Sequence, residues 1–382
     1  MKPRLPIPLR FCVLFACTLN VFGLVSTCLS GAELATLLST IRAVEPGSQG
    51  NANATRAWKQ IAQADAEDLP LVLAALDGAS PLAANWLRSA VDTIAARGLH
   101  RDGELPVKAL EQFVLDTNHD PRARRLAYEW IVRIDKTAQT RLIPGMWNDP
   151  SVEFRRDAVG QLLASADQLR KQDQQPAAIK MYRQAMAGAR DKDQVDASAK
   201  QLRALGQEVD LPRHFGFLMD WQVIGPFDNT DRKGFASAYS PERELDESAQ
   251  YDGKSSSVKW QEYSTKDDYG MVDLNVPFGK LKETVGYAWT QFTSERAQEV
   301  QLRLGCKNAW KVWLNGEMIF AREEYHRGMR LDQYLMPVKL KPGSNDILLK
   351  LCQNEQEESW TVEWQFQLRV CDRTGTAVAS RN

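Results

Sequence analysis

Residues 312–320 read VWLNGEMIF, and three copies of the pattern Arg-x-Ala-apolar precede them in the chain. In the quoted stretch, Asn315-Gly316 separates two apolar runs, which is a strong hairpin signal because a type I′ turn needs positive φ at both central positions. The three copies begin at Arg88, Arg125 and Arg156. Repetition at this spacing predicts stacked helical hairpins. We therefore expect a helical repeat array followed by a β-sandwich.

Length and charge limit the class of protein. A chain of 382 residues exceeds what one hydrophobic core usually organises, so about two domains are expected. The chain has 48 basic and 49 acidic residues, a net charge of -1, and no basic stripe. Nucleic acid is therefore not an expected partner.

Residues 1–32 have the features of a signal peptide. Three basic residues precede an apolar run at 11–25, and small residues follow up to the expected cleavage after Ala32. The apolar run has about 15 residues and falls short of the roughly 20 that span a bilayer, so no stable membrane span is expected. The mature protein would be secreted or periplasmic, in the cell envelope. A lipoprotein attached through Cys28 is the alternative.

Residues 33–213 are expected to be helical. Apolar positions recur at spacings of three and four in residues 58–62, 69–76 and 86–95. Asp-Pro occurs at 120–121 and at 149–150, where Asp can cap a helix and Pro at its first position loses no hydrogen bond. Both dipeptides therefore predict helix starts.

Two stretches resemble known helical repeats. Residues 149–159, DPSVEFRRDAV, resemble a HEAT repeat in the order of Asp-Pro, Arg and Ala-Val. Residues 176–185 resemble the first helix of a tetratricopeptide (TPR) motif, with 195–205 as its partner. The resemblance implies an all-α solenoid of HEAT/TPR-like type. We interpret the repeated arginines as packing residues, and a binding row on a concave surface stays open as the alternative.

Residues 214–376 are expected to form an all-β sandwich or jelly roll, with a flexible tail at 377–382. Near Phe215 the period changes from 3.6 to 2, and nine short strand candidates follow with turn signals between them. Alternation is clean in residues 300–306 and 364–370, where one face of each strand is predicted to be core.

The β half resembles the galactose-binding-domain-like jelly roll of secreted bacterial proteins, similar to the sugar-binding domains of family 2 glycoside hydrolases. The resemblance rests on LRLG at 302–305, KVWLNG at 311–316, VKLKPG at 338–343 and NDILLK at 345–350. It implies ligand binding through loops at one end of the sandwich. Several members also hold a structural calcium ion, and the only dense oxygen cluster near a strand end here is Asp228, Asn229 and Asp231. No other cofactor is expected.

Aromatic residues in the β half suggest where a glycan would bind. Trp310 and Trp360 lie at strand ends beside polar residues and are predicted to be exposed. Core or rim packing is the alternative for each of them. The predicted polar loop neighbours are Asn308, Glu324, Tyr325, His326, Arg327, Asp332 and Gln353.

Three cysteines, Cys306, Cys352 and Cys371, lie beyond the signal peptide. At most one disulfide can form among them. Strand alternation places Cys352 and Cys371 on the polar faces of consecutive strands, so a disulfide between these two is one prediction. Buried free thiols are the other.

The chain has no recognisable catalytic pattern. Its four histidines lack metal-site spacing, and neither a nucleophile elbow nor a nucleotide-binding glycine loop occurs. We expect a non-catalytic exported binding protein of the cell envelope, with a glycan or an envelope protein as partner of the sandwich and the helical repeats as interaction scaffold. The alternatives are a purely structural protein-protein scaffold and, third, an uncharacterised hydrolase-associated enzyme.

Overall fold

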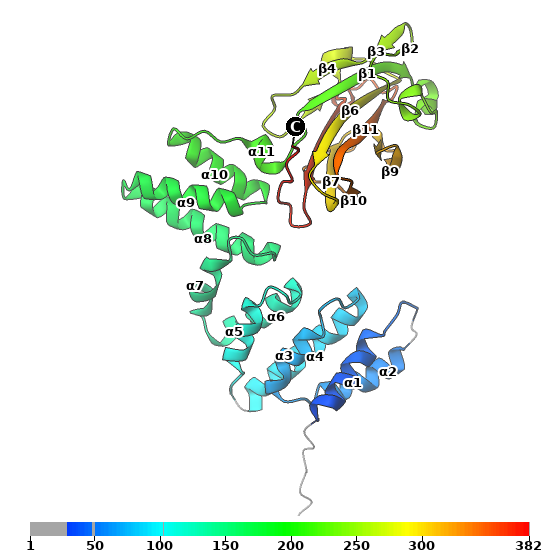
Figure 1. Cartoon of the computed structure of the whole chain (residues 1–382). Helices are drawn as coiled ribbons and strands as arrows, with labels where there is room; N and C mark the ends of the chain where they lie inside the picture. Colours follow the sequence, from blue (N-terminus) through cyan, green and yellow to red (C-terminus); the bar gives the residue numbers. More distant parts are fainter. Residues whose placement is uncertain (1–28, 48–49, 102, 382) are drawn as a thin grey trace, which may run out of the picture. The chain divides into compact units, whose positions relative to one another are not determined.

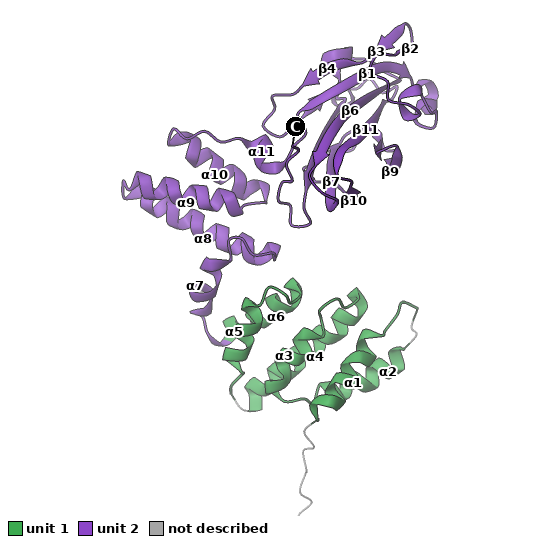
Figure 2. Cartoon of the chain, in the orientation of Figure 1, with its two compact units in different colours: residues 1–133 green, residues 134–382 purple. Residues whose placement is uncertain are grey.

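The computed structural model describes residues 29–47, 50–101 and 103–381 (Figure 1). The chain divides into two compact units, Met1–Arg133 and Ile134–Asn382 (Figure 2). A helical part precedes a part made of antiparallel sheets, as the change of period predicts. The expected signal peptide, up to Cys28, lies outside the described residues. Within those residues, no helix combines the length and the apolar character that crossing a membrane requires.

The helices of the first unit follow one another with short connections. They are α1 (Gly31–Arg42), α2 (Asn51–Ile61), η1 (Ala66–Asp68), α3 (Leu69–Ala74), α4 (Pro81–Arg101), α5 (Val107–Leu115) and α6 (Pro121–Ile134), whose last residue belongs to the second unit. Helix α6 begins at Pro121, as the first Asp-Pro predicts.

The second unit starts with helices that continue to residue 215. They are α7 (Ala138–Leu142), η2 (Ile143–Met146), α8 (Val152–Lys171), α9 (Gln175–Gly188), α10 (Lys192–Ala204) and α11 (Leu211–Phe215). The second Asp-Pro does not start α8. The cap is Ser151, whose Oγ accepts a hydrogen bond from the backbone N–H of Phe154 at 3.4 Å. The serine hydroxyl takes the capping position because it reaches an otherwise unsatisfied N–H of the first turn.

The three copies of the repeated pattern lie in α4, α6 and α8, and in each copy the alanine and the apolar residue after it are buried. In two of the copies, the first residue, an arginine, forms an ion pair with a later helix of the same unit. Arg88 Nη2 lies 3.3 Å from Glu129 Oε2 on α6, and Arg156 Nη2 lies 2.7 Å from Asp193 Oδ2 on α10. These contacts support the interpretation of the arginines as residues that join neighbouring helices.

The strands of the second unit begin at residue 220. They are β1 (Asp220–Asp228), β2 (Gln250–Asp252), β3 (Ser257–Lys259), β4 (Gln261–Ser264), β5 (Val272–Asp273), β6 (Thr284–Ser294), β7 (Gln298–Cys306), β8 (Ala309–Leu314), β9 (Glu317–Arg322), β10 (Tyr334–Leu340), β11 (Gly343–Gln353) and β12 (Gln365–Cys371). Short helices lie between them: η3 (Thr230–Phe235), η4 (Ser240–Glu242), α12 (Asn275–Phe278) and η5 (Ser359–Thr361).

Two antiparallel sheets pack face to face around one core. A six-stranded sheet has the order β4-β1-β6-β11-β8-β9, and a four-stranded sheet has the order β10-β7-β12-β5; β2 and β3 form a separate ribbon. Leu302 of β7 and Phe366 of β12 share a buried cluster with Leu349 of β11 and Val312 of β8, so the core contains side chains from both sheets. This confirms the alternation predicted for residues 300–306 and 364–370.

The predicted hairpin joins β8 to β9. Asn315 has φ 53° and Gly316 has φ 83°, the positive values that a type I′ turn needs. The side chain of Asn315 also ties this turn to β11, because its Oδ1 accepts from the N–H of Asp346 at 3.0 Å. The hairpin therefore lies in the six-stranded sheet through both backbone pairing and a side-chain contact.

Helices of the second unit dock on the four-stranded sheet through buried charges. Arg369 of β12, 1% exposed, donates from Nη1 to the carbonyl of Phe215 at 3.0 Å and from Nη2 to Asp332 at 2.6 Å. Arg303 of β7 donates to the same carboxylate at 2.7 Å. The predicted domain boundary at residue 213 thus lies inside the second compact unit, because α8–α11 pack with the sheets.

Asp332, predicted as a polar neighbour of a ligand, is a structural residue of this junction. Burial would raise the pKa of its carboxyl, but the hydrogen bonds and charges of Arg369 and Arg303 outweigh burial and hold that pKa below its ordinary value. The carboxylate stays ionised between two guanidinium groups. Removing its charge would leave both cations without their counter-ion.

We expect Asp332→Asn to lower the free energy of unfolding by about 3–5 kcal/mol, since breaking a buried ion pair leaves uncompensated charge. Urea denaturation monitored by circular dichroism measures the change. Asp268→Asn is the matched control, because Asp268 pairs with Arg203 of α10 at 2.8 Å in an exposed position and should cost less than about 1 kcal/mol. Equal losses in the two variants would contradict the assignment.

His214 of α11 predicts a pH dependence of stability. Its Nε2 lies 3.0 Å from the carbonyl oxygen of Ala189, and burial, with the charge of Arg190, lowers its pKa from 6.5 to about 4. Below pH 6.5 the unfolded chain therefore binds a proton that the folded chain does not bind. Stability should fall as the pH drops from 6.5 toward 4, by at most about 3 kcal/mol.

The variant His214→Gln should lose this part of the slope while its amide keeps a donor for Ala189. Burial also lowers the pKa of His326, and this residue contributes a slope of the same sign in both proteins. Urea midpoints measured between pH 4.5 and 8 compare the two. Identical slopes would show that His214 does not titrate as its surroundings require.

Candidate functional site

Three connections meet at one end of the sandwich: residues 229–232 after β1, 323–333 between β9 and β10, and 354–364 between β11 and β12. We call this the loop end. Asn229 joins the three, because its Nδ2 lies 2.9 Å from the carbonyl oxygen of Gln353 and 3.3 Å from Tyr325 Oη. The structure therefore brings several of the predicted site residues together.

A layer of amides lies buried under the loop end. Gln353 is 0% exposed, and its Nε2 donates to the carbonyl of Thr361 at 2.9 Å. Asn308 is 1% exposed, and its Nδ2 donates to Gln353 Oε1 at 3.3 Å and to the carbonyl of Glu363 at 3.1 Å. The prediction of Asn308 and Gln353 as ligand contacts is wrong, because the loops cover them. Their amides hold the loops in place.

Trp310 is also buried, contrary to its predicted exposure. It is 0% exposed in the core between the sheets, with its ring 4.9 Å from the ring of Tyr334 and stacked on Phe320 at 5.7 Å between centroids. Position 310 belongs to the core-facing positions of β8, together with Val312 and Leu314. Alternation along the strand, not its place at the strand end, decides the burial of this indole.

Trp360 is the exposed aromatic residue of the loop end, as predicted, at 58% exposure. It lies on η5, where Thr361 Oγ1 donates to the carbonyls of Gln356 at 2.8 Å and Glu358 at 2.7 Å. The ring of His326 meets the indole at 90° with centroids 5.8 Å apart. The loop therefore presents the indole from a backbone fixed by hydrogen bonds.

His326 is oriented by a buried amide. Its Nε2 lies 2.6 Å from Asn354 Oδ1, so the amide oxygen accepts the Nε2 proton, and Asn354 is 0% exposed. Burial lowers the pKa of His326, and the hydrogen bond from the ring opposes this effect. The imidazole is therefore neutral at pH 7, with Nδ1 as its acceptor.

The loop end also holds several ion pairs. Arg232 Nε lies 3.1 Å from Glu355 Oε2, and the guanidinium of Arg232 lies 5.3 Å from the ring centroid of Tyr325. Glu324 pairs with Arg322 at 3.0 Å and with Arg327 at 3.7 Å. Glu324, Tyr325 and Arg327 thus lie close to His326, as the sequence predicts.

The calcium candidates face lysines. Asp228 Oδ1 lies 3.2 Å from Lys254 Nζ, and Asp231 Oδ2 lies 2.8 Å from Lys233 Nζ. Asn229 Oδ1 is buried without a hydrogen-bond partner, but neither carboxylate is free to join it. Across the described residues, no three His, Cys, Asp or Glu side chains are placed to hold a metal ion. Calcium binding stays a prediction that this pairing does not support.

The predicted disulfide between Cys352 and Cys371 is wrong. Cys352 lies in β11 of the six-stranded sheet and Cys371 in β12 of the four-stranded sheet, because β12 pairs with β7 and not with the preceding strand. Both residues and Cys306 are free, buried thiols. Burial raises the pKa of Cys306 and of Cys352 to about 12, so these two thiols stay protonated.

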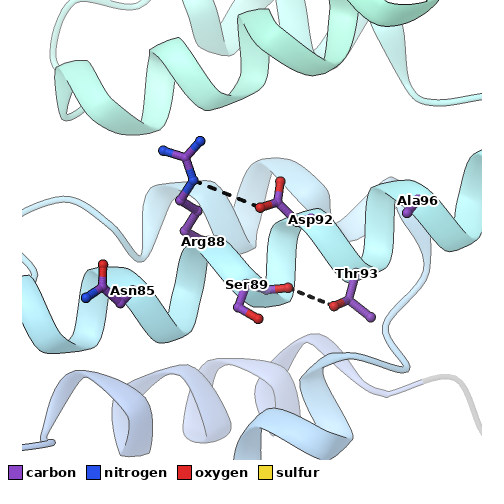
Figure 3. Close-up of a pocket in the computed structure, with 6 residues that line it drawn as sticks. All are labelled: Asn85, Arg88, Ser89, Asp92, Thr93 and Ala96. Atoms are coloured by element: carbon purple, nitrogen blue, oxygen red, sulfur yellow. Dashed lines mark hydrogen bonds and ion pairs between the residues drawn. The ribbon is translucent and has the colours of Figure 1, made fainter.

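Two further hollows were not predicted from the sequence. One lies on α4 in the first unit and is drawn in Figure 3; its lining residues, Asn85, Arg88, Ser89, Asp92, Thr93 and Ala96, form one face of that helix. Arg88 Nε lies 4.0 Å from Asp92 Oδ2 within it. The other, of about 460 Å³, lies against β1, β4 and β6. Neither has a sequence motif, because its residues come together through helix or sheet geometry.

Comparisons with known proteins give distant likenesses. No protein-family model matches the chain, and no curated protein matches it. Similar solved structures include a β-glucosidase from Kluyveromyces marxianus, with 14% identity over 45% of this chain and 22% of that chain and a TM-score of 0.27. A Faecalibacterium prausnitzii β-glucuronidase has 11% identity over 41% of this chain and 31% of that chain, with a TM-score of 0.22.

A GH31 α-xylosidase from Xanthomonas citri is 8% identical over 41% of this chain and 16% of that chain, with a TM-score of 0.19. The chain thus spans less than a third of the length of each of these three enzymes. Likenesses at these TM-scores are too distant to transfer an activity to this protein.

The buried amides predict a contrast between two variants of the loop end. Gln353→Leu should lower the free energy of unfolding by about 2–4 kcal/mol, because it removes the buried hydrogen bonds that Gln353 makes with Asn308 Nδ2, the carbonyl of Thr361 and the backbone N–H of Asn354. Trp360→Ala should change it by less than about 0.5 kcal/mol, since the indole is mostly exposed. Urea denaturation of both variants provides the measurement, and a large loss in Trp360→Ala would show that the indole is a packing residue.

Proposed function

We propose that this protein is a non-catalytic, exported binding protein of the cell envelope whose β-sandwich binds a glycan at the loop end. The observation that carries the proposal is the exposed indole of Trp360, held by hydrogen bonds on η5 beside the imidazole of His326. The finer assignment of the sheets as a galactose-binding-like jelly roll, and of the helices as a HEAT-like solenoid, belongs to the same proposal.

A flat exposed indole suits a sugar ring. The apolar face of a pyranose can cover the indole and remove apolar area from water, which contributes about 25 cal/mol per Å². Neighbouring polar groups then fix the orientation of the hydroxyls. The imidazole of His326 beside the ring, and the pair Arg232 and Glu355 elsewhere in the loop end, supply donors and acceptors. The hydrogen-bonded loops lower the cost of ordering the site on binding.

Two carboxylates, one at the loop end and one next to it, support binding rather than acid catalysis. Glycoside hydrolysis needs a carboxyl whose pKa is raised so that it can donate a proton. Here the hydrogen bond from Arg232 lowers the pKa of Glu355, and the hydrogen bond from Thr230, aided by Lys254, lowers that of Asp228. Both groups are therefore held in the ionised form and act as partners of cations.

A protein-protein scaffold is the second candidate function, and two exposed leucines of the first unit favour it. Leu71 of α3 is 42% exposed and Leu115 at the end of α5 is 55% exposed. Exposed large aliphatic side chains of this kind are the anchors that a partner protein can cover. In this case the helices would bind an envelope protein.

A polysaccharide array tests the glycan proposal. We expect the mature full-length protein to bind at least one polysaccharide of the array. Trp360→Ala should weaken that binding about tenfold or more. Leu335→Ala is the matched control, because Leu335 on β10 is 49% exposed but lies outside the loop end. Unchanged binding by Trp360→Ala, or equal losses in both variants, would contradict the loop-end site.

A further inference from the structure

The outer face of the six-stranded sheet has a pocket where β4, β1 and β6 lie side by side. It has a volume of about 460 Å³, and Asp220, Gln222, Glu262, Trp289 and Gln291 line it together with Glu247 from the connection after η4. These strand residues alternate with Val223 and Ala288, which face the core between the sheets. The pocket is therefore built from the side of the sheet that the core does not use.

A smaller pocket of about 140 Å³ adjoins it on the same face. Its lining includes Asp346, Leu348 and Trp313 from the next two strands, and Glu244 from the segment after η4. Leu348 is paired with Trp289 across β6 and β11, and Asp346 with Gln291. The two pockets together cross β4, β1, β6, β11 and β8, a distance of about 19 Å at the usual strand spacing.

Hydrogen bonds hold the lining of both pockets in place. The carboxylate of Asp346 accepts from Trp289 Nε1 at 3.2 Å and from Gln291 Nε2 at 3.1 Å. Lys350, 0% exposed, holds the wall after η3: its Nζ donates to the carbonyl of Ser237 at 2.6 Å and to Glu242 at 2.7 Å. The pockets are thus preformed, which lowers the cost of binding.

The charge of the larger pocket has one sign. Three of its lining residues, Asp220, Glu247 and Glu262, are carboxylates, and no lysine or arginine lines it. Glutamine amides and hydroxyl groups make up the other polar lining, with indole surface between them. The larger pocket therefore favours a ligand that supplies hydrogen-bond donors and disfavours one that carries acidic groups.

A sugar chain fits this surface better than a peptide. An extended peptide gains affinity mainly by pairing its backbone with an exposed strand edge, whereas these pockets offer side chains on the face of a sheet. Carboxylates and amides beside indole rings match the hydroxyl groups and apolar faces of sugars. We propose that the two pockets form a second binding site, separate from the loop end, for an oligosaccharide without acidic groups, either neutral or amino-substituted.

Affinity electrophoresis of the mature full-length protein tests this site with three soluble probes: a neutral β-glucan, chitosan oligomers and polygalacturonate. We expect retardation by the β-glucan or by chitosan and none by polygalacturonate. Gln222→Ala/Glu262→Ala should weaken the binding about tenfold. The single variant Glu262→Ala, at an exposed position of β4, should weaken it in the same direction and serves if the double variant is unstable.

Leu335→Ala, at an exposed position outside both sites, is the control and should leave the retardation unchanged. Trp360→Ala removes the indole of the loop end, so retardation that remains in this variant belongs to the sheet face. The inference is overturned if no probe binds, or if polygalacturonate binds as well as the other two. It is also overturned if an oligolysine peptide binds more tightly than either glycan. Loss of binding in Trp360→Ala with full binding in the two pocket variants would assign the glycan to the loop end alone.

Discussion

The carboxylate of Asp332 between Arg303 and Arg369 is the interaction on which the second unit depends. This carboxylate joins the connection after β9 to β7 and β12. Arg369 also donates a hydrogen bond to the carbonyl of Phe215 at the end of α11. Charges are costly to bury unless each is paired and hydrogen-bonded, and here every partner belongs to a different segment. The last helices and the four-stranded sheet are therefore one folded body.

Buried polar groups hold the other surfaces of the sandwich as well. Lys350 fixes the segment after η3 on the outer face of the six-stranded sheet, and Gln353 fixes the loops at one end. Both candidate binding surfaces lie directly on these fixed groups. Trp360 projects from a loop that the amides stabilise, and the sheet-face pockets lie beside the segment that Lys350 holds. The rigid interior therefore supplies preformed surfaces, so that little conformational entropy is lost when a ligand binds.

Local patterns predicted the fold well and the site only in part. The hairpin at Asn315-Gly316 and the alternation of residues 300–306 could be predicted, because each depends on neighbours in the chain. The exposure of residues at a strand end could not be predicted, because loops from distant parts of the chain cover Asn308. The prediction that consecutive strands pair is wrong for the strand of Cys371, because consecutive strands of a sandwich can belong to different sheets. The sheet-face pockets arise only when five strands from separate stretches of the chain align, and no sequence motif predicts this alignment.

The most direct test of this account compares the thermal unfolding of fragments 134–382 and 214–382. Phe215, Phe217 and Tyr269 pack against helices α8–α10, and Arg155 of α8 donates to the carbonyl of Thr374 at 2.8 Å. The account predicts one cooperative transition for the longer fragment and a melting temperature for the shorter fragment that is lower by about ten degrees or more, on the order of 3–5 kcal/mol in stability. Equal melting temperatures would show that the sheets fold independently of the helices and would contradict the account.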